Sequence, residues 1–228
     1  MRTRPDPATH NGQKESHSWP RAVYLNQHIA GFNDMHARAR PTLYEQLEAL
    51  PEGLVGEILD GQLYTQPRPS GPHSLAASAL GGELFGPFHR GRGGPGGWWI
   101  IDEPELHFMR DIEVDVPDIA GWHRDRMPRI PAGHRFEITP DWICEILSKS
   151  TEGKDRDIKM PIYAQYGVAH AWLLDPRSRT LEAYALENSV WREIGRFSGD
   201  VLVSVEPFEA IAIDLAVLWE VDSEYSGT

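Results

Sequence analysis

The sequence predicts an α/β domain with a mixed central β-sheet, flanked by a few helices and extended by β-hairpins. Three observations lead to this prediction: many short apolar runs of β-like composition, few stretches with helical periodicity, and turn-forming dipeptides between neighbouring runs. The chain has 228 residues, of which 40% are hydrophobic, so it can bury a sizeable core. No segment is repeated, and the pattern as a whole favours helices packed on a sheet.

The first part of the chain is expected to differ from the rest. Residues 1–40 are rich in Pro, His, Asn, Arg and Gln and show no sustained periodicity. This composition predicts a flexible N-terminal extension, with the domain itself occupying residues 41–228. The domain is expected to open with a short helix over 42–47, where Thr42 and Glu45 fit a capping box.

A β-hairpin is expected to follow this helix. Asp60-Gly61 separates the β-like runs 54–59 and 62–65, and this dipeptide favours a two-residue hairpin turn. Residues 73–86 then show the apolar spacing of a helix. The Gly-rich stretch 91–97 predicts a loop, and no phosphate-loop lysine follows it, so we expect no nucleotide site there.

The second half of the chain alternates strands with one further helix. Pro161 lies inside the helical pattern of 155–166, so it should kink that helix or sit in a first turn. A Pro-rich connection spans 128–140. The expected strands are 98–101, 114–120, 142–147, 170–174 and 201–205, with a hairpin from 181–186 and 191–194 and a terminal amphipathic piece over 211–218.

Composition narrows the range of functions. The formal net charge of −12 argues against a generic nucleic-acid-binding protein, but it does not exclude a nuclease whose bound metal neutralises acids locally. The single cysteine, Cys144, excludes an intramolecular disulfide and a cysteine-rich zinc site, and it is expected in the core. The sequence shows neither a run of roughly 20 apolar residues nor a signal peptide. A soluble, cytoplasmic protein with no membrane partner is therefore expected.

Three acidic residues within apolar runs indicate a functional site. Glu145 lies in Trp142-Ile143-Cys144-Glu145-Ile146-Leu147, Asp118 follows Val116-Pro117, and Glu57 lies in the first strand of the expected hairpin. An unpaired buried carboxylate costs several kcal/mol or becomes protonated, so something must compensate these charges. A divalent cation is the simplest compensation if the three acids converge.

The same residues suggest roles in phosphodiester hydrolysis. Asp118 and Glu145 could bind the metal, with the backbone carbonyl of Ile146 as a further ligand, and Glu57 could bind a second metal or position a water. Lys159 is the candidate cation for the charge that develops on the phosphate. Asp155 and Tyr163 lie four residues before and after Lys159, so the three share one helix face.

Each of these residues also has a purely structural interpretation. Glu57 could form an ion pair, His73 could make a structural hydrogen bond rather than contact substrate, and Asp155 could stabilise the helix start. Tyr163 could be a packing residue, and Lys159 could lie along the helix surface. Asp115 alternates with Glu113 and is expected to face solvent.

Together these motifs resemble the Uma-two family of predicted restriction endonucleases, within the PD-(D/E)XK nuclease superfamily. The resemblance runs from about Thr42 to Trp219. It is carried by the hairpin Glu57-Ile58-Leu59-Asp60-Gly61, His73, Pro117-Asp118, Glu145-Ile146-Leu147-Ser148, Ser150-Thr151, Asp155, Lys159, Tyr163, Gly167-Val168 and Trp172-Leu173-Leu174-Asp175-Pro176. It implies a restriction-endonuclease-like fold, with magnesium on Asp118 and Glu145, Lys159 as the signature lysine and Glu57 as the acid of the first core element.

In two respects the sequence departs from the family pattern. The superfamily lysine normally lies two residues after the strand glutamate, where this chain has Leu147. The resemblance moves its role to Lys159, and Lys149, at a position where the family usually has proline, is a second candidate.

The resemblance predicts a Mg²⁺-dependent endodeoxyribonuclease, with Mn²⁺ able to replace Mg²⁺, DNA as partner and substrate, and a homodimer that cuts both strands. The alternatives are a catalytically inactive domain of the same fold, serving as a protein-interaction or regulatory module, and a metal-dependent hydrolase of another phosphoester.

Overall fold

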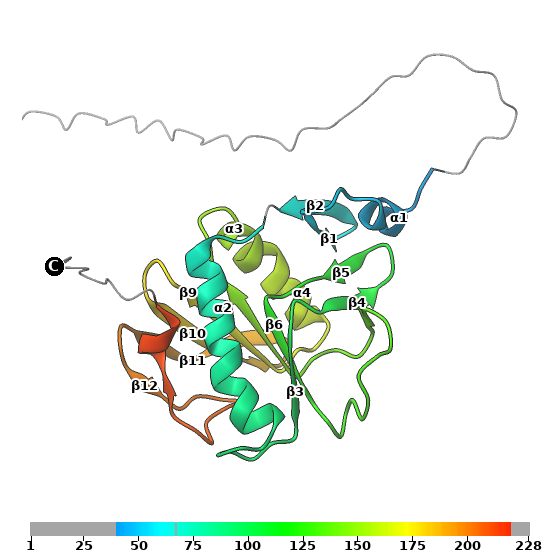
Figure 1. Ribbon diagram of the computed structural model, residues 1–228. Helices are drawn as coiled ribbons and strands as arrows, with labels where there is room; N and C mark the ends of the chain where they lie inside the picture. Colours follow the sequence, from blue (N-terminus) through cyan, green and yellow to red (C-terminus); the bar gives the residue numbers. More distant parts are fainter. Residues whose placement is uncertain (1–39, 67, 220–228) are drawn as a thin grey trace, which may run out of the picture. The chain divides into compact units, whose positions relative to one another are not determined.

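The computed structural model of the chain describes residues 40–66 and 68–219 (Figure 1). Apart from Arg40, the expected N-terminal extension lies outside the described residues and stays a prediction. Among the helices of the described ranges, none is both long and apolar enough to cross a membrane.

The first elements are those that the sequence predicts. In α1 (Leu43–Glu48), the Thr42 hydroxyl accepts a hydrogen bond from Glu45 N–H while the Glu45 carboxylate accepts one from Thr42 N–H, which confirms the capping box. β1 (Val55–Leu59) and β2 (Gln62–Gln66) form the antiparallel hairpin. Asp60 and Gly61 both have positive φ, 50° and 67°, as a two-residue hairpin turn with the twist of its strands requires.

Two larger sheets form the body of the described chain. The six-stranded sheet has the order β11-β10-β9-β8-β6-β3, and the five-stranded sheet has the order β2-β1-β5-β4-β7. The strands of the first are β3 (Trp98–Asp102), β6 (Ile119–His123), β8 (Trp142–Ile146), β9 (His170–Asp175), β10 (Thr180–Glu187) and β11 (Val190–Ser198). Those of the second, besides β1 and β2, are β4 (Glu105–Met109), β5 (Glu113–Asp115) and β7 (Arg135–Phe136). A short pair, β12 (Leu202–Val203) and β13 (Ile213–Asp214), is followed by the 3₁₀ turn η3 (Leu215–Leu218).

The six-stranded sheet is mixed because one of its pairs is parallel. β8 and β9 run parallel, and the other pairs of this sheet are antiparallel. A parallel pair needs a crossover connection, which the helical segments α3 (Glu152–Lys154), η2 (Asp155–Lys159) and α4 (Met160–Gln165) supply. Every residue of β8 is buried, which explains why its sequence is a continuous apolar run rather than an alternating one.

Proline explains the irregularity of the two long helical segments. Pro161 lies in the first turn of α4, as expected, and the preceding turn η2 has π-helical hydrogen bonding. Likewise α2 (Gly71–Leu84) continues into the π-helical turn η1 (Phe85–His89), which contains Pro87. Proline lacks the N–H of a normal helical bond and its ring crowds the previous turn, so the helix widens there.

The helices cover opposite faces of the six-stranded sheet. α2 lies across one face (Figure 1), where Ala76 and Leu80 pack in one core with Ile119 and Cys144. On the other face Met160 and Tyr163 pack with Ala120, Ile143 and Leu173. Cys144 is a buried core residue, as predicted. The central strands β6 and β8 are therefore covered on both sides.

One predicted strand is wrong in its extent. The run 114–120 was expected as one strand, but β5 ends at Asp115 and β6 begins at Ile119, and the two belong to different sheets. Pro117 lies between them and cannot donate a ladder hydrogen bond, so the chain leaves one sheet and enters the other here. Strands β4 and β7 were not predicted; β7 is only two residues long, within the Pro-rich connection.

The packing of α2 leads to a matched stability prediction. Leu80 is fully buried in the core, whereas Leu75 on the same helix is 42% exposed. Leu80→Ala should lower the free energy of unfolding by roughly 2–5 kcal/mol because it leaves a cavity, and Leu75→Ala by less than about 1 kcal/mol. Urea denaturation followed by circular dichroism measures both; equal losses would mean that α2 does not pack as described.

Candidate active site

The crossing between the two sheets places Asp118 beside Glu145. β6 and β8 are antiparallel, and their register pairs Ile119 with Cys144. One residue further along this register, Asp118 faces Glu145, and residues opposite each other across an antiparallel pair project from the same face of the sheet. The break at Pro117 therefore ends the first strand and brings Asp118 to the central strand of the other sheet.

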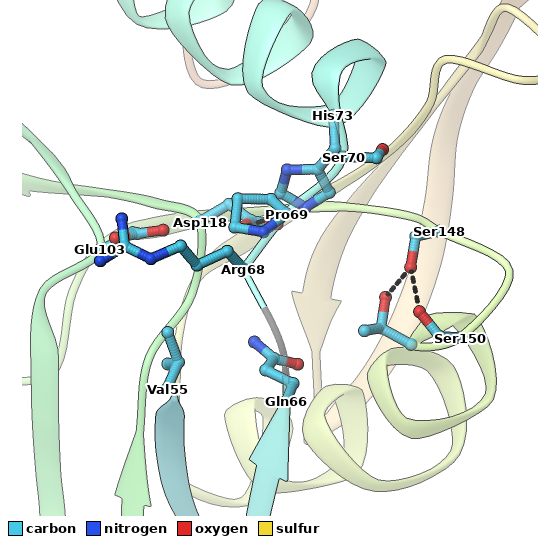
Figure 2. Close-up of a pocket in the computed structure, with 11 residues that line it drawn as sticks. Val55, Gln66, Arg68, Pro69, Ser70, His73, Glu103, Asp118, Ser148 and Ser150 are labelled. Atoms are coloured by element: carbon cyan, nitrogen blue, oxygen red, sulfur yellow. Dashed lines mark hydrogen bonds and ion pairs between the residues drawn. The ribbon is translucent and has the colours of Figure 1, made fainter. Parts of the chain in front are cut away.

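Asp118 is held by the backbone of β8 and by α2. Its Oδ2 accepts a hydrogen bond of 2.6 Å from Ile146 N–H, and His73 Nε2 lies 3.2 Å from its Oδ1. Figure 2 shows His73 at the start of α2 with its ring close to Asp118. Burial of the ring lowers the pKa of His73, but the carboxylate of Asp118, together with those of Asp155 and Glu103, raises it above its ordinary value. The first turn of α2 is thus tied to this aspartate.

Glu145 is buried and makes two close contacts from the crossover helix. Its side chain lies 2.7 Å from Lys159 Nζ, and the Tyr163 hydroxyl donates a hydrogen bond of 2.5 Å to the same oxygen, Oε1. Glu145 is 2% exposed. Burial raises the pKa of Glu145 well above its ordinary value, Lys159 opposes this rise, and the nearby carboxylates of Asp155 and Asp118 add to it. Of the predicted face of Asp155, Lys159 and Tyr163, the last two contact Glu145 directly.

Lys159 lies at the centre of an acidic cluster. Its Nζ is 2.7 Å from Glu57 Oε1 and 3.5 Å from Asp115 Oδ1, and it donates a hydrogen bond of 3.1 Å to the Val116 carbonyl. Burial alone would lower its pKa, but the carboxylates, Glu145 and Glu57 first, raise it well above the ordinary value. Lys159 is 1% exposed, whereas Lys149 is exposed at the surface. Of the two candidate lysines, the structure places Lys159 beside Glu145.

Glu57 is engaged by two lysines, one of which the sequence analysis missed. Its Oε1 accepts from Lys159 and, at 3.2 Å, from Val116 N–H, and its Oε2 is paired with Lys154. Lys154 also donates a hydrogen bond of 2.7 Å to Gln66 Oε1. Burial opposes ionisation of Glu57, but the two ammonium groups lower its pKa to about 2. Lys154 lies five residues before Lys159, a spacing that gave no signal in sequence.

Asp115 does not face solvent, and the expectation from its alternation with Glu113 is wrong. Asp115 is 0% exposed, and Glu113 is also buried. The reason is that the crossover helix covers this part of β5, where Lys159 and Tyr163 both reach the Asp115 carboxylate. Tyr163 donates a weak hydrogen bond of 3.4 Å to Asp115 Oδ1, while Oδ2 has no partner in residues 40–66 and 68–219. Burial raises the pKa of Asp115 to about 7, Lys159 opposes the rise, and Glu57 adds to it.

Asp155 lies close to the same cluster. It is buried at the point where α3 continues into η2, and burial raises its pKa although Lys159 and Lys154 oppose the rise. Its carboxylate contributes to the raised pKa values of both Glu145 and His73. Asp155 therefore adds negative charge to the site as well as standing near the start of the crossover helix.

A cavity of about 200 Å³ opens beside Asp118. Figure 2 shows the side chains of Arg68, Glu103 and Gln66 on one side of it and the hydroxyl-bearing turn after β8 on the other. In that turn the Ser148 hydroxyl is hydrogen-bonded to those of Ser150 and Thr151, both at 3.0 Å. Asp118 and His73 line the cavity, whereas Glu145 and Lys159 are not among its lining residues. These lining hydroxyls and Arg68 were not predicted as site residues.

The side chains present fit a divalent cation of the magnesium type in their donor chemistry. Asp118 and Glu145 offer carboxylate oxygens from opposite positions of two paired strands, and the hydrogen bonds and ion pairs of Glu145 with described residues use only Oε1. Magnesium commonly takes one or two protein carboxylates and completes its shell with water and substrate phosphate. No group of three or more His, Cys, Asp or Glu side chains in the described ranges is arranged to hold a metal by itself.

Comparison with known proteins gives the same picture of the fold. The family model Uma2, described as "Putative restriction endonuclease", matches residues 41–217. A crystal structure of "a putative nuclease belonging to DUF820" from Anabaena variabilis ATCC 29413 superposes with a TM-score of 0.63 at 26% sequence identity, covering 78% of this chain and 97% of that one. No curated protein matches the chain. The predicted restriction-endonuclease-like α/β fold is confirmed by these likenesses.

The raised pKa of Asp115 predicts a particular pH dependence of stability. Between its ordinary pKa of 3.8 and about 7, the unfolded chain ionises Asp115 while the folded chain keeps the proton, so this residue's contribution to stability is present below pH 4 and is lost as the pH rises to 7. Asp115→Asn cannot ionise. Its stability relative to wild type should therefore rise over this range by about 1 kcal/mol per pH unit.

Urea denaturation of both proteins at several pH values from 4 to 8, with a chelator present, measures this difference. Asp125→Asn, an exposed aspartate, is the control and should follow the wild type. Parallel curves for wild type and Asp115→Asn would show that Asp115 is ionised throughout.

Proposed function

Since the chain belongs to the Uma2 family of putative restriction endonucleases, we propose that it is a Mg²⁺-dependent endonuclease that hydrolyses phosphodiester bonds in DNA. The observation that carries the proposal is the buried contact of 2.7 Å between Lys159 Nζ and Glu145 Oε1, with Asp118 opposite Glu145 at the edge of a cavity. A carboxylate pair with an adjacent lysine is the chemistry that metal-assisted phosphodiester hydrolysis needs.

The charge balance of the cluster supports a cation site. Glu57, Asp115, Asp118, Glu145 and Asp155 lie around two ammonium groups, those of Lys154 and Lys159. Burial raises the pKa values of Asp115, Glu145 and Asp155, and the lysines do not fully offset this rise. A divalent cation supplies the missing positive charge without requiring protons.

In this proposal each residue has a defined task. Asp118, Glu145 and the carbonyl of Ile146 would hold the magnesium, which when bound polarises a phosphoryl oxygen and acidifies a water. Lys159 and Tyr163 fix the orientation of Glu145, and the charge of Lys159 would stabilise the phosphorane or orient the attacking water.

The cavity is where we place the phosphate of the substrate. Arg68 and the hydroxyls of Ser148, Ser150 and Thr151 line it, and these groups can donate hydrogen bonds to phosphate oxygens. His73 lines the same cavity and contacts Asp118, so it would orient the metal ligand from the substrate side. A homodimer, in which each site cuts one strand, would account for cleavage of duplex DNA.

A catalytically inactive domain of this fold, used for protein interaction or regulation, is the second candidate. Two observations favour it: Leu147 stands where the superfamily has its lysine, and the net charge of −12 disfavours tight DNA binding. Measurements of DNA cleavage and of metal binding by the purified protein separate the two candidates, because only the endonuclease should show both.

The assigned roles predict a clear order of activities. Glu145→Gln and Lys159→Met should each lower Mg²⁺-dependent cleavage of supercoiled plasmid by roughly 100-fold or more, since each removes an electrostatic element of the site. Lys149→Met is the matched control for the lysine, because Lys149 is exposed, and it should keep wild-type activity. Unimpaired cleavage by Glu145→Gln would contradict the proposed site.

Metal binding predicts a thermal shift that does not depend on knowing the DNA target. Mn²⁺ at about 100 times its dissociation constant should stabilise the wild type by roughly 2.7 kcal/mol, since it binds the folded state only. Asp118→Asn should fold but lose this shift, because one of the two carboxylate ligands is gone. Calorimetric titration checks the affinity directly, and absence of any Mn²⁺ or Mg²⁺ binding to the wild type would favour the inactive domain.

A further inference from the structure

Both oxygens of Glu57 are already paired with lysines. Its Oε1 contacts Lys159 Nζ at 2.7 Å and accepts a hydrogen bond of 3.2 Å from Val116 N–H, and its Oε2 is paired with Lys154. The side chain is 1% exposed and does not line the cavity beside Asp118. A second metal bound by Glu57 would have to displace buried ammonium groups, and breaking a buried ion pair costs several kcal/mol.

The position of Glu57 suggests a different task. Lys159 has a long, flexible side chain, and its ammonium group is fixed between Glu57 on one side and Glu145 on the other, 2.7 Å from each. Glu57 belongs to β1 in the five-stranded sheet, and Glu145 belongs to β8 in the six-stranded sheet. Lys159 therefore spans the two sheets, and its location relative to Glu145 depends on Glu57.

Lys154 holds Glu57 itself in place. Its ammonium group pairs with Glu57 Oε2 and donates a hydrogen bond to Gln66 Oε1 on the neighbouring strand β2. Residues 57 and 66 thus face the same lysine from the two strands of the hairpin. With Oε2 held by Lys154, the other oxygen of Glu57, Oε1, contacts Lys159.

From these contacts we propose that Glu57 is a positioning residue, which fixes Lys159 against Glu145, and that the site takes one divalent cation per chain. The inference rests on the proposed function, and it replaces the second-metal or water-positioning role that the sequence suggested for Glu57. Glu57 acts through Lys159 and touches neither the metal nor the substrate.

The first test counts metal ions on the unmodified protein. Titration with Mn²⁺, followed by electron paramagnetic resonance of the free ion, should give one tightly bound ion per chain. Two ions per chain would overturn the inference. No binding at all would overturn the proposed function, and the inference with it.

The second test compares Glu57→Gln with the wild type. It should still bind Mn²⁺, because Glu57 is not a metal ligand in this proposal and reaches Glu145 only through Lys159. Its kcat should fall by roughly 10-fold or more with KM unchanged, since Lys159 loses its fixed position. Glu52→Gln, at an exposed glutamate near the start of the same hairpin, is the matched control and should change neither quantity.

A double-mutant cycle gives the decisive readout. In a Lys159→Met background, Glu57→Gln should cause no further loss of kcat, because a positioning residue has nothing left to position. If the two substitutions instead lower kcat by independent factors, or if Glu57→Gln loses Mn²⁺ binding, the inference is overturned. The proposed function is then still tested separately, by the activity of Glu145→Gln. If Glu57→Gln does not fold, the ion count on the wild type still decides between one site and two.

Discussion

The bridge Glu57–Lys159–Glu145 is the interaction on which the rest of the site depends. It joins β1 of one sheet to β8 of the other through the ammonium group of the crossover helix, with 2.7 Å contacts on both sides. Buried ion pairs contribute little net stability, because desolvation offsets their attraction, but losing one partner is costly. The bridge therefore fixes the geometry between the two sheets more than it stabilises the fold.

The parts of the fold that could be predicted are those whose signals are local. The capping box of Thr42 and Glu45, the Asp60-Gly61 turn and the apolar run of β8 each follow from a few neighbouring residues, and each is present. The split of 114–120 between two sheets could not be predicted, because it depends on which strands pair with β5 and β6. The burial of Asp115 was also missed, because alternation along a strand does not show which segments pack on each face, and here Lys159 and Tyr163 of the crossover helix reach Asp115.

The same distinction applies to the site. Carboxylates in apolar runs are visible in sequence, and the register of β6 and β8, continued by one residue, sets Asp118 opposite Glu145. Lys154 gave no signal, because its partners Glu57 and Gln66 are about 90 residues away. The hydroxyls of Ser148, Ser150 and Thr151 also gave none as cavity-lining groups, since short polar residues are common in any turn.

The packing around β8 gives a physical reason why position 147 is leucine and not lysine. Leu147 follows Glu145 by two positions, so it projects from the same face of the strand, and it is buried in the core with Tyr163, Val168 and Leu173. A lysine at 147 would place its stem and charge in this apolar cluster. The crossover helix packs on the same face of the sheet, and its Lys159 contacts Glu145. Because the ammonium then reaches Glu57 as well, moving the lysine from the strand to the helix makes the position of the cation depend on the first hairpin, a dependence that a lysine on β8 would not require.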